Sequence, residues 1–171
     1  IELNTLSSLD PIIKKFDFEK ASILFHNSKY FGISKSLSKR LSFVSADLFH
    51  GHGLWEYPVH SMSKIALKRR IPYIITLRGM LEPWTLKQGA LKKQIALSLY
   101  QKKDLNNADC IHVTGLMEFQ NFRNLGYKNP IAVIPNGINI EDFLSDKPKK
   151  KKNPKEILFL SRIHKKKGIE N

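Results

Sequence analysis

Two short segments of the sequence combine histidine, arginine and tryptophan in a way that suits the binding of a polar ligand. They are HGHGLWEYP, residues 50–58, and RGMLEPW, residues 78–84. The candidate residues in them are His52, Gly53, Trp55, Arg78, Gly79 and Trp84. Aromatic faces pack against sugar rings while fixed donors bind hydroxyl groups, so this mixture favours carbohydrate recognition. The alternative for each tryptophan is that it only packs over the end of a sheet.

A histidine pair in the first segment raises the question of a metal. His50 and His52 are two positions apart at the end of an apolar run, so in a strand both rings leave the same face. A zinc site needs three or four ligands that converge, and the remaining histidines are scattered singly along the chain. We therefore expect no metal and no other cofactor.

A third segment, LSRIHKKKGIEN at residues 160–171, is strongly basic. Three explanations are open: a solvated tail, a nucleic-acid-binding patch, or part of a site for a phosphate-bearing ligand. It follows SDKPKKKKNPK, residues 145–155, where two prolines and a run of lysines without apolar side chains predict an exposed linker.

Strand-length apolar runs alternate with amphipathic stretches along the chain. The runs are residues 22–26, 47–51, 72–77, 109–113, 131–134 and 156–160. The predicted helices are residues 34–43, 58–69, 89–107 and 115–125. Strands that are apolar on both faces and separated by helices predict a parallel sheet covered on both sides, as in a Rossmann-like α/β domain.

The order of these elements places the candidate residues together. Ligands of open parallel sheets bind beyond the carboxyl ends of the strands. His52 and Arg78 each follow such an end, and so does Thr114, which we expect to cap the next helix. Gly126 has the position of a left-handed residue that ends that helix.

The predicted helix at residues 89–107 has the clearest periodicity. Leu91, Ile95 and Leu99 are four positions apart, while lysines occupy other parts of its circumference. We interpret it as a surface helix with one buried stripe. Contact of its lysines with an anionic membrane surface is the alternative.

The net charge of +14 favours polyanionic partners. Residues 146–171 contain ten basic and three acidic side chains, so half of the excess lies there. For a nucleic-acid-binding module the pI of 9.9 is the sole support, because no recognised motif accompanies it. A single cysteine and the lack of a long apolar run indicate a soluble cytoplasmic protein, with peripheral membrane contact left open.

The domain organisation follows from the same pattern. We expect a Rossmann-like domain at residues 1–144 that lacks its first strand and helix, then the basic linker at residues 145–155. Residues 156–171 would be the first strand and the helix start of a second domain. A lone strand and helical turn cannot close a core, so we expect the chain to be truncated there. The residues before Ser22 begin without a methionine and show no clean periodicity, so we expect truncation at the front as well.

Taken in order, five segments resemble the retaining glycosyltransferases of family 4, which have the two-domain GT-B fold. These segments are HGHGLWEYP, IPYIITLRGMLEPW, ADCIHVTGLMEF, VIPNGINIEDF and ILFLSRIHKKKG. The resemblance extends over residues 47–168. It implies transfer of a sugar, with retention, from a nucleotide-sugar to a polysaccharide or a lipid-linked glycan, without a metal.

The resemblance also implies roles for particular residues. Arg162 and Lys167 would contact the donor diphosphate and stabilise the leaving nucleoside diphosphate, with Gly168 starting the helix beside them. His52, Gly53, Trp55, Arg78, Gly79, Trp84 and Thr114 would line the acceptor side. Many family members have histidine where Arg78 stands, which is a departure.

The same resemblance predicts that the chain alone is inactive, because a glutamate-bearing motif that holds the donor sugar lies beyond it. The alternatives to a sugar transferase are a basic nucleic-acid-binding module and a non-catalytic Rossmann-like binding module. We expect no nucleic-acid partner.

Overall fold

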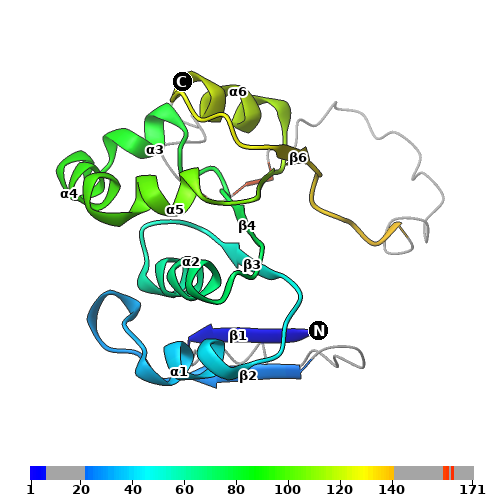
Figure 1. Ribbon diagram of the computed structural model, residues 1–171. Helices are drawn as coiled ribbons and strands as arrows, with labels where there is room; N and C mark the ends of the chain where they lie inside the picture. The colour runs from blue at the N-terminus through cyan, green and yellow to red at the C-terminus, as the bar shows by residue number, and fades with distance from the viewer. Residues whose placement is uncertain (7–21, 141–159, 162, 164–171) are drawn as a thin grey trace, which may run out of the picture. The chain divides into compact units, whose positions relative to one another are not determined.

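The computed structural model describes residues 1–6, 22–140, 160–161 and 163 (Figure 1). The chain divides into two compact units, Ile1–Pro135 and Asn136–Asn171, and the described helices and strands all lie in the first. The predicted linker, Arg162, Lys167 and Gly168 lie outside the described residues. The predicted division into residues 1–144, 145–155 and 156–171 stays a prediction.

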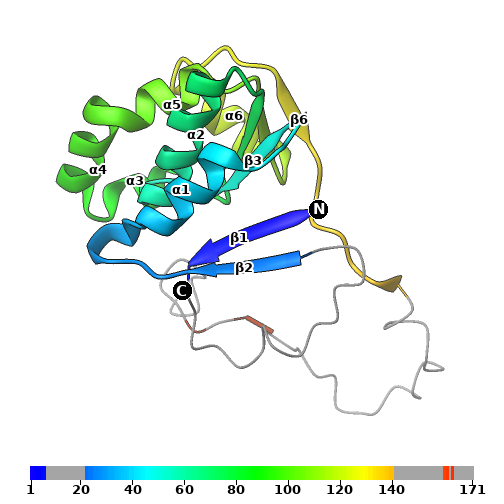
Figure 2. The same ribbon diagram turned by 60° about the horizontal axis from the view of Figure 1, so that its bottom comes forward.

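The described strands form two parallel sheets. The larger has the order β3 (Phe49–His52), β4 (Tyr73–Thr76), β5 (Cys110–Val113) and β6 (Ile131–Val133), with every neighbouring pair parallel. The smaller pairs β1 (Glu2–Leu6) with β2 (Ser22–His26), which lie side by side and point the same way (Figure 2). Parallel sheets with intervening helices confirm the predicted Rossmann-like α/β class.

Strand β1 was not among the predicted strands. Its sequence ELNTL is too polar to read as an apolar run. Polar contacts hold it instead: the Asn4 Oδ1 atom lies 2.8 Å from His26 Nε2, and Glu2 pairs with Arg40. That ion pair holds the pKa of Glu2 at about 2, because Arg40 and then Asn4 donate hydrogen bonds to the carboxylate.

Three predicted helices appear within about one residue of their expected bounds. They are α1 (Lys35–Phe43), α2 (Tyr57–Arg69) and α6 (Leu116–Asn124). Ser34 caps α1 by accepting the Leu37 amide at 3.2 Å, and Pro58 stands in the first turn of α2. The left-handed Gly126, with φ +86°, follows the end of α6 as predicted. Two short elements were missed: η2 (Tyr30–Gly32) and α3 (Pro83–Lys87).

The long helix predicted at residues 89–107 is interrupted by a π turn. It comprises α4 (Ala90–Ala96), the π turn η3 (Leu97–Gln101) and α5 (Lys102–Asn106). The prediction that Leu91, Ile95 and Leu99 form a buried stripe is wrong, since they are 71%, 49% and 74% exposed. Gln101, Asp104 and Leu105 are buried instead.

Polar anchors explain which face of this helix is buried. The Tyr73 hydroxyl donates to the Asp104 carbonyl at 2.7 Å, and His60 Nδ1 lies 2.9 Å from the Asp104 carboxylate. Both partners lie on core elements, β4 and α2. The spacing of leucines alone could not reveal these partners, and the wider π turn also shifts the register of the helix.

The core lies between the larger sheet and its helices. Buried strand residues are Phe49, Tyr73, Ile75, Ile111 and Val113, and they pack in one cluster with Met62, Ala66, Leu105 and Phe122 from the helices. Gly51 in β3 lies so close to α2 that an added Cβ would meet Met62 Cε at 2.9 Å. Close helix packing therefore fixes the strand whose end carries His52.

Candidate functional site

Three loops meet at the carboxyl edge of the larger sheet, because β3, β4 and β5 are parallel neighbours. The Gly53 amide donates to the Thr76 carbonyl at 2.9 Å, and the Leu54 amide lies 2.9 Å from Met80 Sδ. Arg78 Nη2 donates to His52 Nδ1 at 3.2 Å. The structure thus joins the first two segments that the sequence singled out.

The backbone of these loops is held in an unusual conformation. Trp55 and Arg78 have φ values of 71° and 55°, and the neighbouring Gly53 and Gly79 have 86° and 70°. Left-handed backbone is unfavourable for residues with a side chain, by roughly 1–2 kcal/mol. Such conformations persist only where surrounding contacts impose them, and they are frequent at functional loops.

Glu118 joins the second loop to the third. Its buried carboxylate accepts hydrogen bonds from the Gly79 amide, from the Thr114 amide at 2.8 Å and from the Thr114 hydroxyl at 3.3 Å. The prediction that Thr114 caps α6 is wrong, because Gly115 is the N-cap and its predecessor Thr114 binds this carboxylate. Glu118 was not predicted as a site residue, although a glutamate in the first turn of a helix is a known sequence signal.

The bond from Arg78 defines the state of His52. A guanidinium can only donate, so His52 Nδ1 is an acceptor and the ring proton of the neutral side chain is on Nε2. Desolvation, followed by the charges of His50, Arg78 and His112, lowers the pKa of His52 to about 4. At neutral pH, His52 therefore presents an exposed N–H donor.

A directional chain of hydrogen bonds runs beside this pair. His112 Nε2 lies 2.9 Å from the Ile134 carbonyl, which only accepts, so neutral His112 accepts from the Thr76 hydroxyl at 2.9 Å through Nδ1. Thr76 in turn accepts from His50 Nε2 at 2.7 Å. Desolvation, with smaller effects of His112 and Arg78, lowers the pKa of His50 and favours its neutral form.

The two histidines that raised the metal question lie against one another. The rings of His50 and His52 stack with centroids 4.4 Å apart. Among the residues that the structure describes, no group of three or more histidine, cysteine, aspartate or glutamate side chains is arranged to hold a metal ion.

The half-buried Trp55 is held by the π turn. Its amide donates to Gln101 Oε1 at 2.9 Å, its carbonyl accepts from the Tyr100 hydroxyl at 2.7 Å, and Lys93 Nζ lies 5.7 Å from its ring centroid. Trp55 Nε1 and Gln101 Nε2 are buried without a hydrogen-bond partner. Trp84, on α3, is 38% exposed, so its ring is accessible. No sequence pattern marks a π turn, so Tyr100 and Gln101 were missed.

A parallel α/β sheet with polar loops gathered at its carboxyl edge defines a Rossmann-like ligand-binding domain. The family model described as Glycosyltransferase Family 4 matches residues 11–142, which is most of the chain, and the chain belongs to that family. The search of curated proteins and the search of solved structures each gave no match.

Family membership confirms the resemblance found in the sequence. The chain carries a glycosyltransferase domain, whose general substrates are a nucleotide-sugar donor and a glycan acceptor. None of the described helices is both long enough and apolar enough to cross a membrane.

Proposed function

We propose that this glycosyltransferase moves a sugar, with retention, from a nucleotide-sugar donor to a polysaccharide or a lipid-linked glycan. The acceptor would bind at the carboxyl edge of the β3–β6 sheet. The observation that supports this most is the joining of the three polar loops there by Arg78–His52 and by Glu118. The proposed acceptor-side residues are His52, Gly53, Trp55, Arg78, Gly79, Trp84 and Thr114.

These residues divide into two kinds of role. His52 and Arg78 offer N–H donors that bind acceptor hydroxyls, and the Trp55 and Trp84 rings pack against sugar faces. The amides of Gly79 and Thr114 already bind Glu118, so these two residues shape the loops. Gly53 lets the chain turn sharply after β3 with φ +86°.

The donor half of the proposal uses residues outside the described part of the chain. In this proposal Arg162 and Lys167 bind the diphosphate, and Gly168, where the resemblance implies the start of a helix, adds amide dipoles that attract it. The acceptor oxygen bonds to the anomeric carbon on the face from which the diphosphate departs, and the acceptor proton ends on that leaving group. The two cations stabilise the departing charge, and the proposal requires no metal or other cofactor.

We also propose a cytoplasmic location at the inner face of the membrane. Leu91, Ile95 and Leu99 are exposed on a helical stretch that also carries exposed lysines, and this combination suits an anionic lipid surface. Sedimentation with anionic and neutral vesicles tests it. We expect binding to the anionic vesicles that weakens with added salt, and equal binding to both kinds would contradict the electrostatic argument.

The enzymatic proposal is tested with sugar-labelled nucleotide donors and a membrane extract as the source of acceptor. The expected result for the protein with its second domain is labelled glycan and released nucleoside diphosphate, with the anomeric configuration retained in the product by NMR. Arg78→Gln should lower the rate, whereas Arg70→Gln, a change at the end of α2, should not.

The 171 residues by themselves should give no turnover, because the proposal needs the second domain to hold the donor sugar. Normal turnover by these residues alone would reject the placement of the reaction between two domains.

A further inference from the structure

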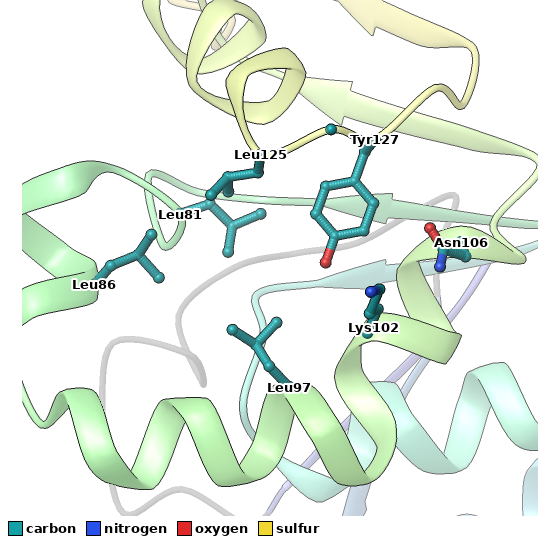
Figure 3. Close-up of a pocket in the computed structure, with 8 residues that line it drawn as sticks. Leu81, Leu86, Leu97, Lys102, Asn106, Leu125 and Tyr127 are labelled. Atoms are coloured by element: carbon teal, nitrogen blue, oxygen red, sulfur yellow. The ribbon is translucent and has the colours of Figure 1, made fainter.

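A cavity of about 290 Å³ lies beside the helical stretch that contains the π turn (Figure 3). Leu81 and Leu86 come from the segment after β4, Leu97 comes from the π turn, and Leu125 and Tyr127 follow α6. Figure 3 shows Leu97 directed toward Leu81 and Leu125 from below. The cavity therefore lies between two parts of the chain that precede and follow β5.

The interior of this cavity is apolar. Leu81 and Tyr127 are only 2% and 9% exposed, and burial raises the pKa of the Tyr127 hydroxyl, which keeps it neutral. Besides the Tyr127 hydroxyl, the polar side chains in the lining are those of Lys102 and Asn106, both exposed. Figure 3 shows the Tyr127 hydroxyl directed toward Lys102. An occupant should have an apolar body and one polar end.

The charge around the cavity indicates the sign of that polar end. Lys102 is the charged side chain in the lining, and residues 82–107 contain five lysines and two acidic residues, Glu82 and Asp104. Asp104 is buried and paired with His60 at 2.9 Å, so it does not offset the lysines at the surface. An anionic group is therefore complementary to Lys102 at the rim.

We propose that this cavity binds the apolar chain of a lipid phosphate, with the phosphate against Lys102. The inference rests on the proposed function, since it makes the acceptor a lipid-linked one and assigns a place to its lipid. Leu81 is three residues beyond Arg78, so the same loop serves the acceptor edge and the cavity. A bare sugar would leave its hydroxyl groups unpaired against the leucines.

The experiment titrates the protein with decyl phosphate below its micelle-forming concentration, followed by calorimetry, with decanol and inorganic phosphate as comparisons. We expect saturable binding of decyl phosphate, at least about tenfold tighter than that of either comparison compound. If inorganic phosphate binds as tightly as decyl phosphate, the proposal is overturned, because the decyl chain would then contribute nothing to the affinity.

Two pairs of variants locate the binding. Leu97→Trp fills the cavity, whereas Leu67→Trp places the same ring at an exposed position of α2, away from the cavity lining. Lys102→Glu reverses the charge at the rim, and Lys64→Glu makes the same reversal at an exposed position of α2. We expect about tenfold weaker binding from the first member of each pair and little change from the second.

If the two variants of each pair bind decyl phosphate with equal affinity, the assignment of the cavity as the lipid-phosphate site is rejected. If Leu97→Trp does not fold, as judged by circular dichroism, the lysine pair decides. No nucleotide-sugar is present in these titrations, so their failure would leave sugar transfer to a water-soluble glycan untouched. Retained lipid-phosphate binding without any sugar transfer would instead reject the proposed function alone.

Discussion

The hydrogen bond from Arg78 to His52 determines what His52 can do. With its pKa at about 4 against an ordinary 6.5, His52 in the folded chain stays neutral where the unfolded chain would be protonated. Between these two pH values the unfolded state binds more protons, so the contribution of His52 to stability falls as the pH is lowered through that window. His52 acts as a fixed donor at neutral pH.

Removing the Arg78 guanidinium should raise the pKa of His52. Arg78→Gln takes away a positive charge that disfavours the imidazolium, so the NMR titration midpoint of the His52 ring should move upward from about 4. Arg70→Gln is a matched control, because Arg70 also has a left-handed backbone, with φ 57°. An unchanged midpoint in Arg78→Gln would show that the guanidinium does not act on the imidazole.

Replacing Glu118 should loosen two loops at once. Glu118→Ala leaves the amides of Gly79 and Thr114 without their acceptor, which should lower the free energy of unfolding by on the order of 1–3 kcal/mol. Urea denaturation measures the loss, and hydrogen exchange should accelerate at both amides. Gln120→Ala, at an exposed position of α6, should change neither. Faster exchange at only one amide would contradict the bridging role.

At this scale the sequence identified the residues of the loops but not those that support them. His52 and Arg78 could be found because each follows an apolar run that reads as a strand. Glu118 and Gln101 act through contacts with residues 39 and 46 positions away. Such pairings depend on the packing of helices on the sheet, which no local pattern contains.

Among the elements, the interrupted helix gives the clearest contrast between a buried and an exposed leucine. Leu105→Ala should lower the free energy of unfolding by about 2–5 kcal/mol, because Leu105 is fully buried. Leu99→Ala should change it by less than about 0.5 kcal/mol, because Leu99 is exposed. Denaturant midpoints of the two variants measure this difference, and similar losses would mean that Leu99 is packed in solution.

Helices were predicted correctly where the sequence contains a residue that starts or stops a helix. Helix α1 begins at a serine cap, α2 has a proline in its first turn and α6 ends before a left-handed glycine. Strand β1 has the sequence ELNTL, which is too polar to form an apolar run, and helix α3 has only five residues, too few for a helical period to emerge. The π turn is likewise a property of tertiary contacts, since Tyr100 and Gln101 bind Trp55 from it.

For the molecule as a whole, we expect the net charge of +14 to give only unspecific binding of nucleic acid. Duplex DNA should bind at low salt through unspecific phosphate contacts and be released by about 150 mM salt, because counterion release makes such binding steeply salt-dependent. Gel shifts across a salt series measure this. A discrete complex of fixed stoichiometry at physiological salt would favour the nucleic-acid-binding alternative instead.

At the same scale, alternation of strands and helices was enough to predict a parallel α/β architecture. The order of the strands and the separation of β1 and β2 into a sheet of their own were not predicted, because several pairings satisfy one apolar pattern. Family membership then supplied the reaction class, which the composition did not indicate.

The shared carboxylate of Glu118 has a thermodynamic consequence. A ligand that displaces the Gly79 amide disturbs the same carboxylate that holds Thr114, so events at the two loops are linked. Linkage of this kind is reciprocal. The change in binding free energy that a ligand at one loop causes for a ligand at the other is equal in both directions. Two groups that bind at the two loops would therefore change one another's affinity by the same factor, without any domain movement.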